Sequence, residues 1–280
     1  MNKKAFLCGV NRYVIPGSDL RGCVNDVQQM RQVLVELFEF AEEDISVVTD
    51  LDATKSNIES GLTDLVTGAT PGDVLYFHFS GHGSNVPDDD GDEADERDEI
   101  FCPTDLNWQD PLRDDWVRTL LDPLPAGVNL TFVSDCCHSG SITRALAAPD
   151  ATVRERYLPC PRDIWAVESN AELTGSVRGE RRARESAAGP TDVKDVDLTE
   201  VLLTGCRADQ TSADAYIEGD YFGALTHSLL ASLRDTGGDI TYGALHAQVL
   251  ERLADRGFSQ TPQLEGRADR FDAGFLTPFA

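Results

Sequence analysis

The feature that most constrains the fold of this chain is the alternation of short apolar runs with longer amphipathic stretches. Apolar runs at residues 5–10, 44–49, 74–80 and 128–134 have the length of buried strands. Between the first two, apolar residues recur at helical spacing from 24 to 38, and Thr54 or Ser56 can cap a second helix. Strands that alternate with helices predict an α/β fold, in which a mostly parallel central sheet is covered on both faces.

The pattern changes in the middle of the chain. From about residue 145 to residue 196 the periodicity fades, which predicts a long exposed linker or insertion. Beyond it, residues 197–206 form a further strand candidate, and helical patterns follow at 223–234 and, capped by Thr241, at 242–256. We therefore expect one domain over residues 1–280, interrupted by this connection, rather than two independent domains.

Charge and cysteine usage exclude several classes of protein. The net charge of -25 would repel nucleic acid and anionic membranes, so neither is an expected partner. The acidity either serves solubility or favours cationic substrates. No apolar run is long enough to span a membrane, and the start of the chain does not have the pattern of a signal peptide. Seven scattered cysteines are typical of reduced thiols, so we expect a cytoplasmic protein, and we expect it to be a monomer.

Reactive side chains follow two of the expected strands. His82 comes just after the strand at 74–80, and Cys137 comes just after the strand at 128–134. Because the carboxyl ends of neighbouring parallel strands share one crevice, this His and this Cys can meet there. A thiol beside an imidazole is the arrangement that nucleophilic catalysis needs. A lone His or Cys at a strand end is more often structural, and His78 is read in that way.

A zinc site is the other chemistry that these residues could carry. Its ligands would be Cys136, Cys137, His138 and His82. Adjacent ligands make poor tetrahedral geometry, and no second thiolate pair supports the site, so zinc is disfavoured.

The two strand ends resemble the catalytic signature of the metacaspases, which are caspase-related peptidases. Residues 80–83 read SGHG, and residues 135–140 read DCCHSG, which is similar to the family pattern of Asp, a small residue, Cys, His, Ser and Gly. Residues 20–26 and 203–214 resemble two further family segments in the same order. The resemblance implies a caspase-like three-layer α/β/α fold. It divides the chain into a large-subunit-like region (1–144), the linker (145–196) and a small-subunit-like region (197–280). Since the chain begins at the first expected strand, it resembles the prodomain-less, bacterial-type members.

The resemblance also assigns roles to single residues. Cys137 would be the nucleophile and His82 the general acid and base, and the backbone amides of Gly83 and Cys137 would form the oxyanion hole. The primary specificity pocket would be lined by Cys23, Asp26, Ser80 and Asp135. Two carboxylates there can pair with Arg or Lys and would repel Asp. Without the resemblance, Asp26 reads more simply as a carboxylate favoured by the start of a helix.

An acidic segment at residues 88–99 raises the question of calcium. Its carboxylate density suits a hard cation, although the spacing does not fit an EF-hand, and a solvated acidic loop is equally expected. The resemblance places a calcium site at Asp98, Asp114 and Asp115, but Arg144 occupies the fourth position, where the family has an acid. Because Arg144 places a cation there, we expect calcium to bind only weakly at this site. Whether activity depends on calcium stays open, and no cofactor is required for the chemistry.

The sequence thus predicts a cysteine endopeptidase that cleaves protein or peptide substrates after Arg or Lys. Self-cleavage is a further hypothesis, at the exposed arginines Arg178, Arg181, Arg182 and Arg184, with a plain surface linker as the alternative. Two other readings of the whole chain stay open: a non-catalytic signalling or scaffold module with the same fold, and a calcium-binding acidic module.

Overall fold

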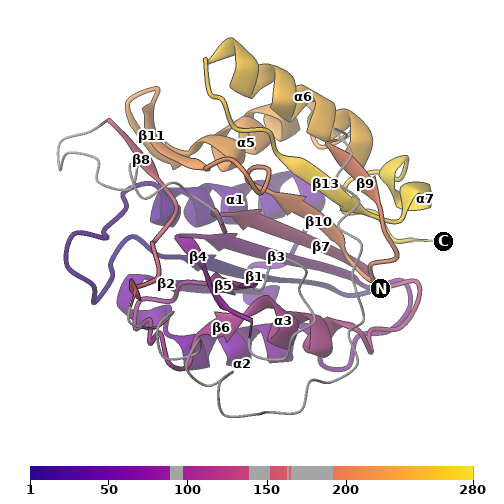
Figure 1. Cartoon of the computed structure of the whole chain (residues 1–280). Helices are drawn as coiled ribbons and strands as arrows, with labels where there is room; N and C mark the ends of the chain where they lie inside the picture. Colours follow the sequence, from indigo (N-terminus) through magenta and orange to yellow (C-terminus); the bar gives the residue numbers. More distant parts are fainter. Residues whose placement is uncertain (89–96, 139–151, 163, 165–191, 280) are drawn as a thin grey trace.

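The central feature of the fold is one twisted sheet between two layers of helices (Figure 1). The computed structural model describes residues 1–88, 97–138, 152–162, 164 and 192–279. The main sheet has the strand order β2-β1-β3-β7-β10-β13-β9, and all neighbours are parallel except β10 and β13. Its strands are β1 (Lys3–Gly9), β2 (Ile45–Thr49), β3 (Val74–Ser80), β7 (Asn129–Asp135), β9 (Val193–Asp195), β10 (Val201–Thr204) and β13 (Gln263–Gly266). The mostly parallel three-layer fold expected from the sequence is confirmed.

Helices cover both faces of the sheet. One face carries α1 (Cys23–Phe38), α5 (Ala224–Thr236) and α6 (Tyr242–Asp255), and the other carries α2 (Lys55–Val66) and α3 (Asp114–Leu121). The short helices η1 (Glu42–Asp44), η2 (Asp50–Asp52) and α7 (Ala268–Phe271) complete the set in the described residues. Thr54 caps α2 by accepting a hydrogen bond from the N–H of Asn57 at 3.3 Å.

Side-chain alternation along the strands builds two cores. In β3, Tyr76 contributes to the core under α1, α5 and α6, whereas Phe77 and Phe79 contribute to the core under α2 and α3. Every residue of β3 and of β7 is buried. A strand covered on both faces reads as a continuous apolar run, which is why the sequence predicted these central strands so well.

Two small sheets extend from one end of the main sheet, and neither was predicted. The first contains β4 (Gly83–Pro87), β5 (Arg97–Phe101) and β6 (Leu112–Arg113); the second contains β8 (Val153–Glu155), β11 (Ala213–Ile217) and β12 (Asp220–Gly223). In the described part of the chain, no helix is both long and apolar enough to cross a membrane.

The described parts of the segment 145–196, which we expected to be an exposed linker, are only partly exposed: Val153 and Val193 are exposed, but both belong to strands. β8 pairs with β11, β9 joins the edge of the main sheet, and the Arg156 side chain is fully buried. These contacts join residues far apart in sequence, so local periodicity could not reveal them.

Candidate active site

The two strand ends singled out by the sequence lie side by side. β3 and β7 are hydrogen-bonded neighbours, and Ser80 at the end of β3 pairs in register with Asp135 at the end of β7. His82 and Cys137 follow these two residues by the same number of positions. The parallel register therefore brings the imidazole and the thiol to one edge of the sheet.

His82 is held with one ring nitrogen engaged. Its Nε2 lies 2.7 Å from the carbonyl oxygen of Ser18, so Nε2 carries the proton and donates it. Its Nδ1 is buried and has no hydrogen-bond partner among the described residues. The ring packs at 4.9 Å from the ring of Tyr13, whose hydroxyl accepts the His82 N–H at 2.8 Å. Burial lowers the pKa of His82 to about 4, so its Nδ1 is an unprotonated base at neutral pH.

Cys137 and Cys136 face different surroundings. The Sγ of Cys137 accepts the N–H of Ser212 at 2.5 Å, and burial, followed by a hydrogen bond with the Cys206 thiol, raises its pKa. The Sγ of Cys136 lies instead 3.1 Å from the Ser134 hydroxyl and 3.5 Å from Nε2 of His138. The two adjacent thiols therefore point to different sites.

His78 has a structural environment. Its Nδ1 and Nε2 lie within hydrogen-bond distance of the hydroxyls of Tyr76, at 3.1 Å, and Thr226, at 3.2 Å. With both ring nitrogens engaged inside the core, His78 supports the fold and is not available to a substrate.

The backbone amides of Gly83 and Cys137 converge on one oxygen atom. Both donate hydrogen bonds to the carbonyl oxygen of Arg156, at 3.0 Å and 3.1 Å. A side chain on Gly83 would come within 2.3 Å of the Cys137 carbonyl oxygen, so only glycine allows this close approach. Two converging N–H groups of this kind can stabilise an oxyanion.

The guanidinium of Arg156 fills an acidic pocket beside these amides. Its Nη2 lies 2.8 Å from the Asp26 carboxylate and 3.1 Å from that of Asp214, and its Nη1 lies 3.3 Å from that of Asp135. Nη1 also donates to the Ser80 hydroxyl at 2.7 Å. The side chains of all four charged residues in this cluster are completely buried. The structure thus brings three of the sequence-selected pocket residues onto one cation.

Neighbouring groups hold the three carboxylates in place. Asp26 accepts the N–H of Gly223 at 3.0 Å, and Asp214 accepts the N–H of Gly22 at 2.9 Å. Asp135 accepts the Thr226 N–H at 2.9 Å. A side chain at Gly223 would come within 2.1 Å of Asp135 and 2.4 Å of Arg156, so this glycine leaves the room that the cation occupies.

The pocket holds more negative charge than one cation balances. Burial raises the pKa of Asp26 to about 7, and Asp135 adds to the shift, even though Arg156 opposes it. Cys23, the fourth pocket residue expected from the sequence, is buried close enough to Arg156 for the guanidinium to lower its thiol pKa, although burial dominates and raises it. A buried site of this charge is built to receive a cation.

Asp214 and Arg156 were not singled out from the sequence. Asp214 is the last residue of the segment 203–214, which resembles a family segment, so its carboxylate could have been predicted to join the acidic pocket. Arg156 carried no local signal, because it reaches the pocket only through the pairing of β8 with β11.

The three acidic residues proposed for calcium lie apart from this pocket. Asp98 is a buried residue of β5 whose carboxylate is bound by Nε of Arg113 at 2.5 Å, and Asp114 and Asp115 start α3. Within the described ranges, no group of three or more His, Cys, Asp or Glu side chains could hold a metal ion. Among these residues, neither the expected calcium set nor the alternative zinc set comes together as a metal-binding group; residues 89–96 of the acidic segment and Arg144 lie outside the described part of the chain.

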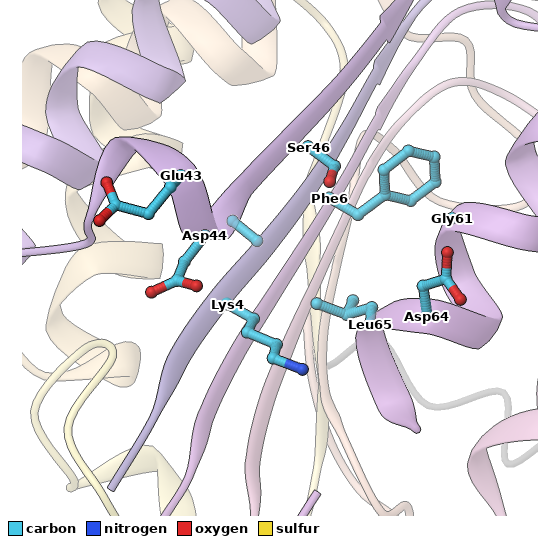
Figure 2. Close-up of a pocket in the computed structure, with 9 residues that line it drawn as sticks. Lys4, Phe6, Glu43, Asp44, Ser46, Gly61, Asp64 and Leu65 are labelled. Atoms are coloured by element: carbon cyan, nitrogen blue, oxygen red, sulfur yellow. The ribbon is translucent and has the colours of Figure 1, made fainter. Parts of the chain in front are cut away.

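A surface pocket of about 180 Å³ lies elsewhere on the molecule (Figure 2). It is bordered by β1, β2, η1 and α2, and Lys4, Asp44 and Asp64 are among the residues that line it. It shares no residue with the site around Cys137, and its lining offers neither a thiol nor an imidazole.

Comparisons with known proteins find relatives that match most of this chain. The family profile described as "Metacaspase, peptidase C14 domain" matches residues 3–145. Metacaspase-1 of Coccidioides immitis is 35% identical over 94% of this chain, and Metacaspase-1A of Aspergillus terreus is 33% identical over 94%. The chain spans 61% of the length of the first relative and 70% of the second.

Two solved structures share the fold. A Geobacter sulfurreducens protein superposes with a TM-score of 0.69 and 22% identity, and 100% of each chain is covered. Caspase-1 from Spodoptera frugiperda superposes with a TM-score of 0.54 and 13% identity, over 95% of this chain and 90% of its own.

Proposed function

The chain belongs to the metacaspase family, and we propose that it is a cysteine endopeptidase that cleaves peptide bonds after arginine or lysine. One observation carries the proposal. An arginine side chain lies among three buried carboxylates, while the carbonyl of the same residue accepts the amides of Gly83 and Cys137. A substrate residue that placed its side chain and its carbonyl in this way would present its peptide bond to Cys137.

The residues of the cleft divide the reaction between them. Cys137 attacks the carbonyl carbon, and His82 takes the thiol proton at Nδ1 and passes it to the leaving amine. The N–H groups of Gly83 and Cys137 stabilise the oxyanion, and water then hydrolyses the thioester. The hydrogen bond from Nε2 of His82 to Ser18 supports this division, because it fixes the tautomer that leaves Nδ1 free to act as the base.

The pocket favours arginine over lysine as the residue before the cut. A planar guanidinium can bind two or more carboxylates at once, as Arg156 does, whereas an ammonium group is a single point of charge. An aspartate in the same position would meet three like charges.

Hydrolysis of a short arginyl fluorogenic peptide tests the proposal against a non-catalytic scaffold. We expect Cys137→Ala to lower kcat/KM by about a thousandfold or more. The matched control is Cys136→Ala, which removes the adjacent buried thiol and should retain activity. Equal hydrolysis by the wild type and Cys137→Ala would refute the proposed nucleophile.

Calcium modulation stays a prediction and takes no part in this mechanism. Oδ2 of Asp98 accepts a hydrogen bond from Arg113, so an ion at this carboxylate would compete with that guanidinium. Peptide hydrolysis in a calcium series and in excess chelator checks it, and identical rates would exclude the ion as a modulator. A cytoplasmic location and a monomeric state also stay predictions. So does self-cleavage, because its expected sites lie outside the described residues: Arg178, Arg181, Arg182 and Arg184.

A further inference from the structure

A chain of buried polar side chains runs from the core to the acidic pocket. It starts at Tyr76 and His78 of β3, continues through Thr226 in the first turn of α5, and ends at Asp135 of β7. The hydroxyl oxygen of Tyr76 lies 3.1 Å from Nδ1 of His78, and Nε2 of His78 lies 3.2 Å from Oγ1 of Thr226. The Thr226 hydroxyl donates to Oδ2 of Asp135 at 2.7 Å. All four residues are buried, so each depends on its neighbours for hydrogen bonds.

One direction of proton donation satisfies every member of this chain. The Asp135 carboxylate can only accept, so the Thr226 hydroxyl donates to it and its oxygen accepts from Nε2 of His78. Burial lowers the pKa of His78 to about 4, so its imidazole is neutral and carries its single proton on Nε2. Nδ1 then accepts from the Tyr76 hydroxyl. Every donor in the chain therefore points toward Asp135.

The chain ends on the oxygen atom of Asp135 that faces the cation. Oδ2 lies 3.3 Å from Nη1 of Arg156, and it accepts the Thr226 N–H at 2.9 Å in addition to the Thr226 hydroxyl. The other oxygen, Oδ1, accepts the Ser212 hydroxyl at 2.6 Å. These contacts hold the carboxylate in one orientation, with Oδ2 toward the guanidinium.

From this chain we propose that Tyr76, His78 and Thr226 are positioning residues that set the preference of the pocket for arginine over lysine. They act through Asp135 and do not touch the substrate. The inference rests on the proposed function and names the groups that determine its specificity.

The two terminal nitrogens of a guanidinium use different carboxylates of the pocket. Nη2 of Arg156 lies near Asp26 and Asp214, whereas Nη1 lies near Asp135. The single ammonium group of a lysine cannot occupy both positions, and the Nη2 position attracts it more strongly because two carboxylates meet there. Contact with Asp135 is therefore the interaction that arginine gains over lysine. Loss of the orientation of Asp135 should reduce this advantage.

Hydrolysis of two peptides that differ only in arginine or lysine before the cut tests the inference. The readout is the ratio of their kcat/KM values, because competition by Arg156 and a loss of folded enzyme lower both values alike. Thr226→Val keeps the N–H and removes the hydroxyl, so the arginine-to-lysine ratio should fall about tenfold, as expected for a hydrogen bond to a charged group. His78→Leu should lower the ratio less, by about threefold, and Tyr76→Phe less again. Thr226→Ser keeps the hydroxyl and should keep the ratio.

Tyr242→Phe is the matched control. Tyr242 and Tyr76 both pack against Phe275, so the change removes a second buried hydroxyl from the same core. This hydroxyl contacts the Thr131 hydroxyl and is not part of the chain. We expect Tyr242→Phe to keep the wild-type ratio.

Nitrogen-15 NMR of the histidine side chains tests the chain without any hydrolysis. The signals of His78 are those that His78→Leu lacks, and we expect a neutral ring with its proton on Nε2 from pH 6 to pH 8. A proton on Nδ1 would overturn the direction of the chain and the inference with it.

The ratios separate failure of the inference from failure of the proposed function. A wild type that hydrolyses both peptides, with a ratio that Thr226→Val does not change, would overturn the inference alone. The same fall in Tyr76→Phe and Tyr242→Phe would also overturn it, and these two variants decide the point if Thr226→Val fails to fold. A wild type that hydrolyses neither peptide would refute the proposed function, and the preference would fall with it.

Discussion

Three buried carboxyl groups contact a single guanidinium, and backbone N–H groups of neighbouring elements help to hold them there; the carboxyl groups belong to Asp26, Asp135 and Asp214. Because burial raises the pKa of Asp26 to about 7, this residue changes charge near neutral pH. Above its pKa Asp26 is anionic and attracts a cation. Below it the carboxyl is neutral, and that attraction is lost.

The titration of Asp26 predicts a pH-dependent KM for arginyl peptides. As the pH falls from about 8 to about 6, KM should rise, by up to about tenfold per pH unit below the pKa. Initial rates over a pH series measure this change. Asp26→Asn should remove the slope, with a KM that exceeds the wild-type value above pH 7 and approaches it at the acidic end of the series. A wild-type KM that stays flat across this range would contradict the charge assigned to Asp26.

Asp214 is predicted to be as important as the residues recognised from the motif. Asp214→Asn removes one charge from a fully buried cluster, which costs about 3 kcal/mol or more, or about a hundredfold in kcat/KM for arginyl peptides. Asp192→Asn is the control, because Asp192 pairs with Arg207 at a partly exposed position where an ion pair contributes little. Equal effects of the two substitutions would show that the pocket does not include Asp214.

At the residue scale, the sequence predicted the site residues that lie in short motifs. It did not predict Arg156, which the pairing of strands β8 and β11 brings to the site. His82, Cys137, Asp26 and Asp135 lie in short motifs whose spacing is visible in the chain. Arg156 has no such motif, and its burial depends on partners at positions 26, 135 and 214. A residue whose environment is assembled from distant segments leaves no periodic signal.

At the scale of elements, strands buried on both faces were predictable and edge strands were not. β1, β3 and β7 read as continuous apolar runs because helices cover both of their faces. β8 and β9 are short and mostly polar, and they form only because β11 and β13 offer an edge. The linker was therefore expected to be exposed, although its described ends belong to sheets.

Packing of α2 on β1 gives a stability prediction. A side chain at Gly61 would come within 2.4 Å of the Phe6 ring, which is 1% exposed and stacks against Phe77 at 5.6 Å. Gly61→Ala should therefore destabilise the fold by about 1–3 kcal/mol in chemical denaturation.

Gly243→Ala is the helical control for this change. An added side chain there would meet its nearest atom, the Phe271 carbonyl oxygen, only at 3.4 Å, so the gain in helix propensity should leave stability equal or higher by about 0.5–1 kcal/mol. If both variants unfolded at the same denaturant concentration as the wild type, the close contact between α2 and Phe6 would be refuted.

At the scale of the whole molecule, the negative net charge and the position of the acidic pocket both favour the binding of cationic peptides. The whole chain has a net charge of -25, and the pocket is itself acidic, so we expect the protein to attract cationic peptides before they bind. The three-layer fold places that pocket and the thiol at one end of the central sheet, where β3 and β7 finish.

Salt should therefore slow the capture of basic peptides. Between about 0.05 M and 0.5 M NaCl we expect kcat/KM for an arginyl peptide with further basic residues to fall several-fold, because added ions screen the surface charge. A peptide with one arginine and neutral flanks should be less sensitive. The same salt response for both peptides would mean that the surface charge does not contribute to capture.

The central claim is that Cys137 attacks the carbonyl of a residue whose cationic side chain fills the acidic pocket. An arginyl peptide that carries a thiol-reactive ketone in place of the cleaved bond tests both parts of this claim. The reagent is added to enzyme that is shown to hydrolyse arginyl peptides, and mass spectrometry then locates the labelled residue. We predict one adduct, on Cys137, formed much faster than with the matching aspartyl reagent and prevented by excess arginyl substrate. An adduct on Cys136, or equal labelling by the two reagents, would contradict the account.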